Sequence, residues 1–309
     1  MSIAYLFPGQ GSQVVGMGQT LYTQFASVRT LYDTADDLLG FPLSTLCFTG
    51  PEEALTDTVN QQPALFVTSL AMLTAVREVG WPEPAFVAGH SLGELAAVVA
   101  AGCASFTDGL QLVRRRGELM KLAGERSAGR MAAVLGAEAL LVAEICAQAT
   151  AETGQLVQIA NDNCPGQIVI SGAIAALVRA TTLLEEQASV RKVVPLPITI
   201  AAHSPLMASV EAEYATAVAS TPLTDPQIPL VGNTTAEILT TATAVRSELN
   251  AQLTGSVRWT ESMHTLTHHG ITEIVEIGPG DVLAKLMKRI DRQVTRRTFD
   301  TAFQISARA

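Results

Sequence analysis

A pentapeptide of the form G-x-S-x-G, GHSLG at residues 89–93, is the first candidate for chemistry in this sequence. It follows the strand-like PAFVA and precedes the helix-like LGELAAVVAAG. This order is typical of a nucleophile elbow, in which glycines allow a tight turn that presents a serine hydroxyl at the start of a helix. The alternative is a serine that simply caps an ordinary helix. Because the flanking elements have the required order, we expect Ser91 to be a nucleophile.

A serine nucleophile needs a base, and the chain offers five histidines. His203 lies in ITIAAHSPLM, after a strand-like run and directly before Ser204-Pro205, a good pair to begin a helix. It therefore also lies on a loop at a strand end, and we expect it to be the base. The side chain of His90 should point away from the elbow. The remaining histidines lie at the end of a helical stretch, lack the glutamate of a zinc motif and are expected to be structural or solvated: His264, His268 and His269.

No acidic residue stands out as the third member of a catalytic triad. Glu211 and Glu213 fall inside the helix that follows His203, and Asp225 lies in a proline-rich loop. We therefore predict a Ser-His pair oriented by a backbone carbonyl.

Three consecutive arginines occur in the helical stretch Asp108 to Ala123. On a helical projection Arg114 and Arg115 lie outside the apolar arc, whereas Arg116 lies in its middle. A guanidinium that faces the interior must be paired with an anion. Two interpretations are open, a structural ion pair or a bidentate clamp for a substrate carboxylate. A plain esterase has no need of such a clamp.

A glycine-rich turn, FPGQGSQ at residues 7–13, follows the apolar run IAYLF. Its spacing does not fit a phosphate cradle, because Val14 stands where G-x-G-x-x-G requires its last glycine. A Walker loop is excluded as well, since Met17 follows Gly16 where the lysine would be. Something other than a phosphate must need this turn.

Several apolar runs end in a Gly or Asn turn and then enter a helical pattern: IAYLF, PAFVAG, IPLVGN and TEIVEI. This rhythm indicates an α/β fold with a mostly parallel sheet whose strand ends carry the site. Residues 126–198 differ, because their order is β-α-β-β-α-β, that of a ferredoxin-like unit. We predict a large domain of residues 1–125 and 199–309, with a small domain of residues 126–198 inserted into it and a ligand site in the cleft between them.

Composition limits the classes of function. The chain has 309 residues, 48% of them hydrophobic, and a formal net charge of -9, which argues against a nucleic-acid binder. No apolar stretch is long enough for a membrane span, and no secretory signal is visible, so we expect a cytoplasmic protein. The four cysteines are scattered and expected to be free buried thiols, and neither a metal site nor a redox cofactor site is predicted. One local basic cluster stands out near the C-terminus: Lys285, Lys288, Arg289, Arg292, Arg296 and Arg297.

Seven segments together resemble the malonyl-CoA:acyl carrier protein transacylase family: FPGQGSQ, GHSLGE, Arg116-Gly117, ANDNCPGQIVISG, the His203 loop, SVRWTESM and EIGPGDVL. The resemblance runs from residue 3 to about residue 290. It implies an α/β-hydrolase-like large domain, a ferredoxin-like small domain, and ping-pong transfer of malonyl from coenzyme A to the phosphopantetheine thiol of an acyl carrier protein.

The resemblance also implies roles for particular residues. Ser91 would carry the malonyl group, His203 would be base and acid, and Arg116 would bind the free carboxylate. The backbone N-H groups of Gln10 and Leu92 would form the oxyanion hole. A backbone carbonyl of the SVRW segment, assigned to Arg258, would receive the histidine proton.

Partners follow from the same resemblance. Malonyl-CoA is expected as substrate and an acyl carrier protein as acceptor, with no cofactor, in fatty-acid synthesis. The chain itself is expected to be a monomer. The basic cluster is a candidate surface for an acidic carrier, or a solvated helix end. A stand-alone acyltransferase for a polyketide synthase, a malonate decarboxylase component and a serine esterase or thioesterase remain alternatives. Relatives carry serine or phenylalanine where this chain has Ala202, so its acyl pocket could be larger.

Overall fold

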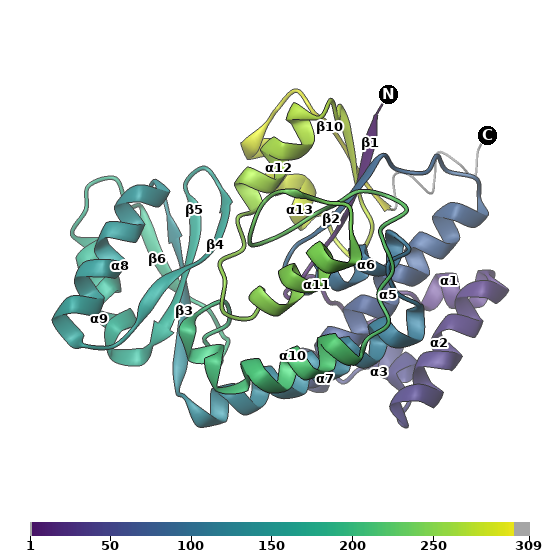
Figure 1. Ribbon diagram of the computed structural model, residues 1–309, viewed down its shortest axis with the longest axis horizontal. Helices are drawn as coiled ribbons and strands as arrows, with labels where there is room; N and C mark the ends of the chain where they lie inside the picture. Colours follow the sequence, from purple (N-terminus) through teal and green to yellow (C-terminus); the bar gives the residue numbers. More distant parts are fainter. Residues whose placement is uncertain (1, 300–309) are drawn as a thin grey trace.

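Two units with separate sheets make up the computed structural model, which describes residues 2–299. Figure 1 shows the smaller unit at the left, in teal, and the larger unit at the right, and both the first described strand, β1, and the last, β10, belong to the larger unit. This arrangement confirms the predicted α/β fold with a second unit inserted into the first. The predicted boundaries at residues 126 and 198 remain predictions, since the strands and helices of the smaller unit span Gly129–Pro195.

The larger unit is built on a six-stranded sheet of order β10-β9-β1-β2-β7-β8. Neighbouring strands are parallel except for β7 and β8. The central strands are almost continuously apolar and buried, as expected when helices cover both faces of a parallel sheet. The strands are β1 (Ile3–Phe7), β2 (Phe86–Gly89), β7 (Leu230–Val231), β8 (Ile238–Leu239), β9 (Glu273–Glu276) and β10 (Thr295–Thr298).

The register of β1 and β2 positions the site. Phe7 lies opposite Gly89, so the turn FPGQGSQ and the turn GHSLG leave the sheet side by side at its carboxyl edge. Sequence patterns predicted both strands and this common edge.

The helix predicted after IPLVGN is absent from the described chain, and that prediction was wrong. The chain instead turns back into β8, and the Gly232 amide donates to the Glu237 carbonyl across a hairpin. The hydroxyls of Thr234 and Thr235 bind the Glu248 carboxylate, which fixes the turn.

Helix α5 (Thr58–Glu78) is the central helix of the larger unit, since its residues from Gln61 to Leu73 are all buried. Helix α7 (Phe106–Arg126) packs on it and begins at Ser105, whose hydroxyl accepts from the Asp108 amide at 3.1 Å. The other helices are α1 (Gln19–Gln24), α2 (Ala26–Leu39), α3 (Leu43–Thr49), α4 (Glu52–Thr56), α6 (Gly93–Ala100), the 3-10 helix η1 (Pro205–Val210), α10 (Glu211–Ser220), α11 (Ala242–Ala251), α12 (Trp259–His268) and α13 (Val282–Ile290).

The smaller unit has the predicted β-α-β-β-α-β order, and its antiparallel sheet runs β4-β5-β3-β6. Alternate residues of β3 face opposite ways: Ala132 and Val134 pack on the two helices, whereas Met131 joins the core of the larger unit. The elements are β3 (Gly129–Leu135), α8 (Ala139–Thr153), β4 (Val157–Cys164), β5 (Gln167–Ala173), α9 (Ile174–Glu185) and β6 (Lys192–Pro195).

Strand β4 connects the two units. Its edge pairs with residues 256–257 of the larger unit: the Val257 amide donates to Ala160 at 2.8 Å, and the Asp162 amide donates to Val257 at 3.0 Å. The side chains of Ser256 and Thr260 add hydrogen bonds to Ile159 and Asp162. The cleft between the units is therefore closed along one side by backbone hydrogen bonds.

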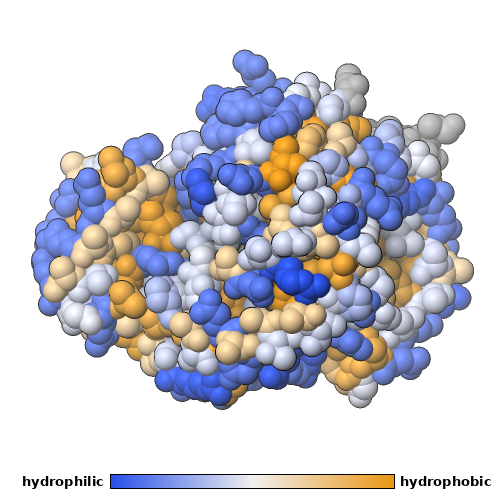
Figure 2. Space-filling view, in the orientation of Figure 1, coloured by the Kyte–Doolittle hydropathy of each residue, from blue (hydrophilic) through white to orange (hydrophobic). Residues whose placement is uncertain are grey.

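The surface carries polar and apolar groups interspersed over most of the face in Figure 2. Within residues 2–299, no helix combines the length and the apolar character that crossing a membrane requires.

Candidate active site

Ser91 lies at the turn between β2 and α6 with a φ of 52°, a left-handed conformation that is uncommon for residues with a side chain. Glycines make this turn possible by allowing close backbone approach. A Cβ at Gly93 would lie 2.0 Å from the Phe7 carbonyl oxygen, and a Cβ at Gly9 would lie 2.4 Å from the His90 carbonyl oxygen. The glycines of the first turn thus let that turn pack directly against the serine turn.

The side chain of Asn233, just after β7, holds the serine turn in place. Its Oδ1 accepts from the Ser91 amide and its Nδ2 donates to the Gly89 carbonyl, both at 2.7 Å. Asn233 is itself fixed, because its backbone amide donates to Glu94 Oε1 at 2.9 Å. Strained backbone of this kind persists only where its surroundings determine it, and these bonds supply that constraint.

The predicted Ser-His pair is present in the geometry, with Ser91 Oγ 2.7 Å from His203 Nε2. On the other side of the ring, Nδ1 lies 2.9 Å from the Gln252 carbonyl and 3.1 Å from the Gly255 carbonyl. Carbonyl oxygens only accept, so Nδ1 carries the proton and Nε2 is free to accept from the serine hydroxyl. Burial, together with the charge of Arg116, lowers the pKa of His203 to about 3, so the ring is neutral near pH 7.

The prediction for Arg258 was wrong. Its carbonyl accepts from the Ser262 amide at 2.9 Å as the start of α12, and its guanidinium binds Glu261 at the surface. The carbonyls that contact the imidazole belong instead to Gln252 and Gly255, in the irregular turn that follows α11. The expectation that a backbone carbonyl, rather than an acidic side chain, orients the histidine is confirmed.

Arg116 is 1% exposed and projects from α7 into the site. Its Nη2 donates to Ser91 Oγ at 3.2 Å, its Nε to Gln252 Oε1 at 3.0 Å and its Nη1 to Gln62 Oε1 at 2.9 Å. Among residues 2–299 no carboxylate lies within ion-pair distance of it. Of the two interpretations left open by the sequence, the structural ion pair is excluded for this part of the chain.

Gln252 connects the other groups of the site. Besides its contacts to His203 and Arg116, its Nε2 donates to the Ser91 carbonyl at 2.9 Å and to Glu94 Oε2. Glu94 is fully buried, and burial, with the nearby Glu248 carboxylate, raises its pKa well above the ordinary value.

The amides predicted for the oxyanion hole are both available. No hydrogen bond within the described chain uses the N-H of Gln10 or the N-H of Leu92. Leu92 precedes the first turn of α6, and Gln10 lines the same cavity as Ser91. Free amides at such a helix start can donate to an oxyanion.

A cavity of about 260 Å³ opens onto Ser91 and His203 between the two units. Its walls are largely apolar, with Met120 and Ala202 from the larger unit and Met131, Ala133 and Val169 from the smaller unit. Helix α13 adds Val282, Leu283 and Leu286. The cavity lies between the two units, where the sequence predicts a ligand site.

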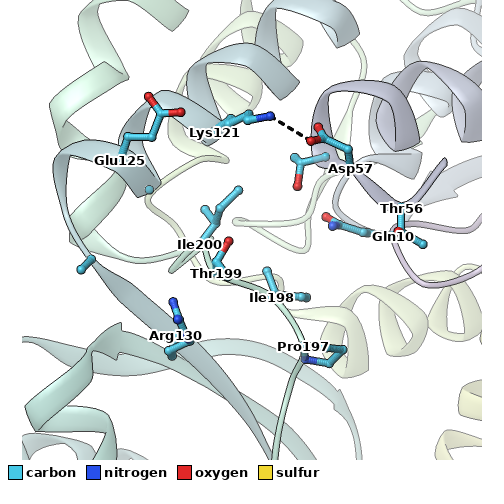
Figure 3. A pocket seen from close by; sticks show the side chains of 13 residues that line it. Gln10, Thr56, Asp57, Lys121, Glu125, Arg130, Pro197, Ile198, Thr199 and Ile200 are labelled. Carbon is cyan, nitrogen blue, oxygen red and sulfur yellow. Dashed lines mark hydrogen bonds and ion pairs between the residues drawn. The ribbon is translucent and has the colours of Figure 1, made fainter. Parts of the chain in front are cut away.

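A second hollow, of about 410 Å³, is bordered by residues of the segment that joins β6 to His203 (Figure 3). Ile198, Ile200 and Gln10 border both spaces. The second hollow contains the Lys121–Asp57 ion pair, at 2.8 Å, and neither Ser91 nor His203. We therefore assign the candidate site to the smaller cavity.

None of the other four histidines is hydrogen-bonded to the nucleophile within the described chain, although His90 borders the same cavity. His90 Nε2 lies 2.8 Å from Asn163 Oδ1 of the smaller unit, and its ring packs edge-on to Trp259. The other three are exposed, at the end of α12 or just beyond it: His264, His268 and His269.

Sequence patterns missed four polar residues of the site: Gln62, Glu94, Asn233 and Gln252. The signal for Gln62 was an amide pair, Gln61-Gln62, directly before the apolar run PALFV in a buried helix. Glu94 and Asn233 end the segments GHSLGE and IPLVGN, but neither segment indicated a role for them, and no local pattern distinguishes Gln252.

An α/β sheet that presents a serine on a strained strand-to-helix turn, hydrogen-bonded to a neutral histidine, defines the class of serine-nucleophile enzymes. Comparison with known proteins narrows the class. The family model described as "Acyl transferase domain" matches residues 4–300. The chain is 42% identical over 292 residues to the malonyl CoA-acyl carrier protein transacylase of Bacillus subtilis, covering 94% of this chain and 91% of that protein.

Solved structures agree with the sequence comparison. The malonyl CoA-acyl carrier protein transacylase of Coxiella burnetii superposes with a TM-score of 0.95 at 35% identity, over 99% of this chain and 96% of that one. A malonyl-transacylase in complex with its type II polyketide acyl-carrier protein superposes with a TM-score of 0.94 at 37% identity, over 99% of both chains. The chain belongs to the acyl transferase family, among the malonyl-CoA:acyl carrier protein transacylases.

Proposed function

We propose that this protein transfers a malonyl group from coenzyme A to the phosphopantetheine thiol of an acyl carrier protein, through a malonyl ester of Ser91. One observation carries the proposal: the Ser91 hydroxyl contacts both a neutral imidazole, at 2.7 Å, and a buried guanidinium that has no carboxylate partner, at 3.2 Å. Family membership supports the same chemistry.

In the first half-reaction, Ser91 Oγ attacks the thioester carbonyl while His203 Nε2 takes the hydroxyl proton. The negative charge on the carbonyl oxygen is stabilised by the amides of Gln10 and Leu92. When the tetrahedral intermediate collapses, the C–S bond breaks and the sulfur of coenzyme A takes the proton from Nε2. The Nδ1–H bonds to two carbonyls keep the ring in the required tautomer throughout.

In the second half-reaction, the pantetheine thiol of the carrier protein gives its proton to His203 Nε2 and attacks the ester. The C–O bond to Ser91 breaks, and Nε2 returns the proton to Oγ. Only protein groups are used, and we propose that no cofactor is needed beyond the thioester substrate. Because a single nucleophile serves both half-reactions, coenzyme A must leave before the carrier arm enters.

The malonyl carboxylate would bind Arg116. Neutral amide oxygens of Gln62 and Gln252 hold the guanidinium without cancelling its charge, which leaves that charge for an anionic ligand. Burial makes an ion pair at this position stronger than it would be in water. A plain esterase would gain nothing from such a group.

Mass spectrometry of the intact protein tests the proposal. Mixing with malonyl-CoA should add one malonyl group to the native chain and none to Ser91→Ala. Parallel reactions with acetyl-CoA and methylmalonyl-CoA measure how far the cavity beside Ala202 admits other acyl groups. Rapid turnover of simple esters without any covalent malonyl adduct would instead assign the protein to the esterases.

Several members of the C-terminal basic cluster bind other groups of the chain. Arg289 binds Gln167 and Pro165, Arg297 binds Glu273, and Arg296 binds backbone carbonyls. Lys285, Lys288, Arg289 and Arg292 are exposed, so the cluster stays a candidate surface for an acidic carrier. We assign the protein to fatty-acid synthesis, and transfer to a fatty-acid carrier compared with a type II polyketide carrier tests this assignment.

We also propose that the protein acts as a monomer in the cytoplasm. All four cysteines are free and buried, which suits a reducing compartment. Light scattering on the purified protein measures its mass in solution and tests the oligomeric state.

A further inference from the structure

Strand β4 of the smaller unit pairs with residues 256–257 of the larger unit, and we call this contact the joint. The side chain of Gln158, on β4, reaches across the joint into the larger unit. Its Nε2 donates to the His203 carbonyl at 2.9 Å and to the Thr254 carbonyl at 3.2 Å. The side-chain amide of Gln158 therefore donates both of its hydrogens, one to each of two loops of the larger unit. No pattern in the sequence distinguished this glutamine.

The two loops are the ones that fix the imidazole. His203 has a φ of 55°, so its backbone adopts a left-handed conformation that a histidine does not prefer. Thr254 lies in the turn whose Gln252 and Gly255 carbonyls accept the Nδ1 proton. The Gln158 amide thus connects the backbone that carries the ring with the backbone that orients it.

We propose that Gln158 is a positioning residue for the Ser91–His203 pair, acting across the joint between the two units. The inference rests on the proposed role of that pair in acyl transfer. Without the amide, the His203 carbonyl loses its donor and the two loops lose their common anchor, so the ring can shift from Ser91 Oγ. Displacements of about 1 Å between reacting groups can cost roughly a hundredfold in rate.

A general role in holding the units together is the competing explanation. Thr260 offers the matched comparison, because its hydroxyl also donates across this joint, at 2.8 Å to Asp162 on the same strand. Unlike Gln158, its bonds do not involve the histidine loop or the turn at 252–255. If Gln158 only held the two units together, replacing Gln158 and replacing Thr260 should change the rate of Ser91 acylation to a similar extent.

The experiment compares Gln158→Met and Gln158→Glu, which keep the length of the side chain without its two donors, with Thr260→Val. The rate of Ser91 acylation is measured by rapid quench over a range of malonyl-CoA concentrations. For both Gln158 variants we expect the maximal rate to fall about tenfold or more, with half-saturation changed less than about threefold. Thr260→Val should retain the native maximal rate.

A second reagent separates this inference from the proposed function. A fluorophosphonate reacts with any histidine-activated serine, whatever the natural substrate. Slower fluorophosphonate labelling of both Gln158 variants than of Thr260→Val supports the positioning role even if malonyl-CoA proves not to be the substrate. Labelling and acylation at the Thr260→Val rates, or a change confined to half-saturation, would overturn it. Two variants are used so that misfolding of one still leaves the comparison.

Discussion

Arg116 is a buried guanidinium whose hydrogen bonds go to two amide oxygens and the nucleophile, with the Tyr214 phenol and the Glu94 carboxyl nearby. Burial lowers its pKa, but arginine stays charged in proteins. A cation kept in the interior without a carboxylate in direct contact is costly unless an anion arrives during function. The local arrangement therefore favours a ligand with a negative group close to its reacting carbonyl.

Replacing this arginine should separate two substrates. In Arg116→Ala we expect acylation by malonyl-CoA to fall by about a hundredfold, as expected for loss of a charged hydrogen bond of roughly 3 kcal/mol. Acetyl-CoA, which has no carboxylate, should lose far less. Arg114→Ala is the control, because Arg114 lies two residues earlier on α7 and pairs with Glu118. Equal losses with both thioesters would make Arg116 a structural residue.

The lowered pKa of His203 predicts an unusual pH dependence. A histidine base works in its neutral form, and with a pKa of about 3 this form persists far below the ordinary value of about 6.5. We therefore expect kcat/KM, which reports the free enzyme, to show no histidine limb between about pH 8 and about pH 5.

The cause of the shift can be tested as well. Burial and the Arg116 charge both lower the pKa of His203. In Arg116→Ala, assayed with acetyl-CoA, the acidic limb should therefore move to higher pH. A native profile that already falls near pH 6.5 would contradict the assignment of a buried neutral base.

The left-handed backbone conformation of the serine turn is stabilised by hydrogen bonds from a neighbouring loop residue, Asn233. Asn233 contacts the residues on both sides of the turn, Ser91 by its oxygen and Gly89 by its nitrogen. Asn233→Ala leaves a buried amide and a buried carbonyl without partners, which costs about 1–3 kcal/mol for each group. We expect lower stability in urea denaturation together with slower acylation.

That experiment includes two further variants, one with an intermediate change and one as a control. Asn233→Asp keeps the oxygen that accepts from Ser91 but not the donor to Gly89, so its acylation rate should lie between native and Ala. Asn250→Ala is the control, since the Asn250 Oδ1 has no hydrogen-bond partner among residues 2–299. Unchanged acylation in Asn233→Ala would show that the glycines alone maintain the turn.

Elements with a strong local pattern were predictable from the sequence, and their tertiary partners were not. The serine turn, the His203 loop and the inward face of α7 each follow from residues close in the chain. The carbonyl that orients His203 does not, because the turn at 252–255 has no regular pattern and reaches the ring only through the fold. The helix expected after IPLVGN was wrong for a related reason, since Thr234 and Thr235 are fixed by the distant Glu248.

At the scale of the whole molecule, the two units share a continuous joint. Backbone pairing of β4 with residues 256–257 and the side chains of His90 and Gln158 cross it. The smaller unit also buries Met131 in the core of the larger one. We expect the two units to unfold together.

The aromatic residues make this testable without labels, because residues 126–198 contain no Phe, Tyr or Trp. Fluorescence of Trp81 and Trp259 therefore reports the larger unit, whereas far-UV circular dichroism reports both. Coincident urea transitions are expected for a single cooperative unit. A dichroism change that begins while the fluorescence is still native would show that the smaller unit unfolds separately.

Gln252 touches the nucleophile's backbone, the histidine and the arginine at once. A substitution that changes which acyl group binds at Arg116 will therefore also disturb Gln252, and through Gln252 it will disturb His203 and the backbone of Ser91. Substrate range and turnover are therefore not independent traits here. A variant selected for a new acyl group should need compensating substitutions around the 252–255 turn before its rate of acyl transfer returns to the native value.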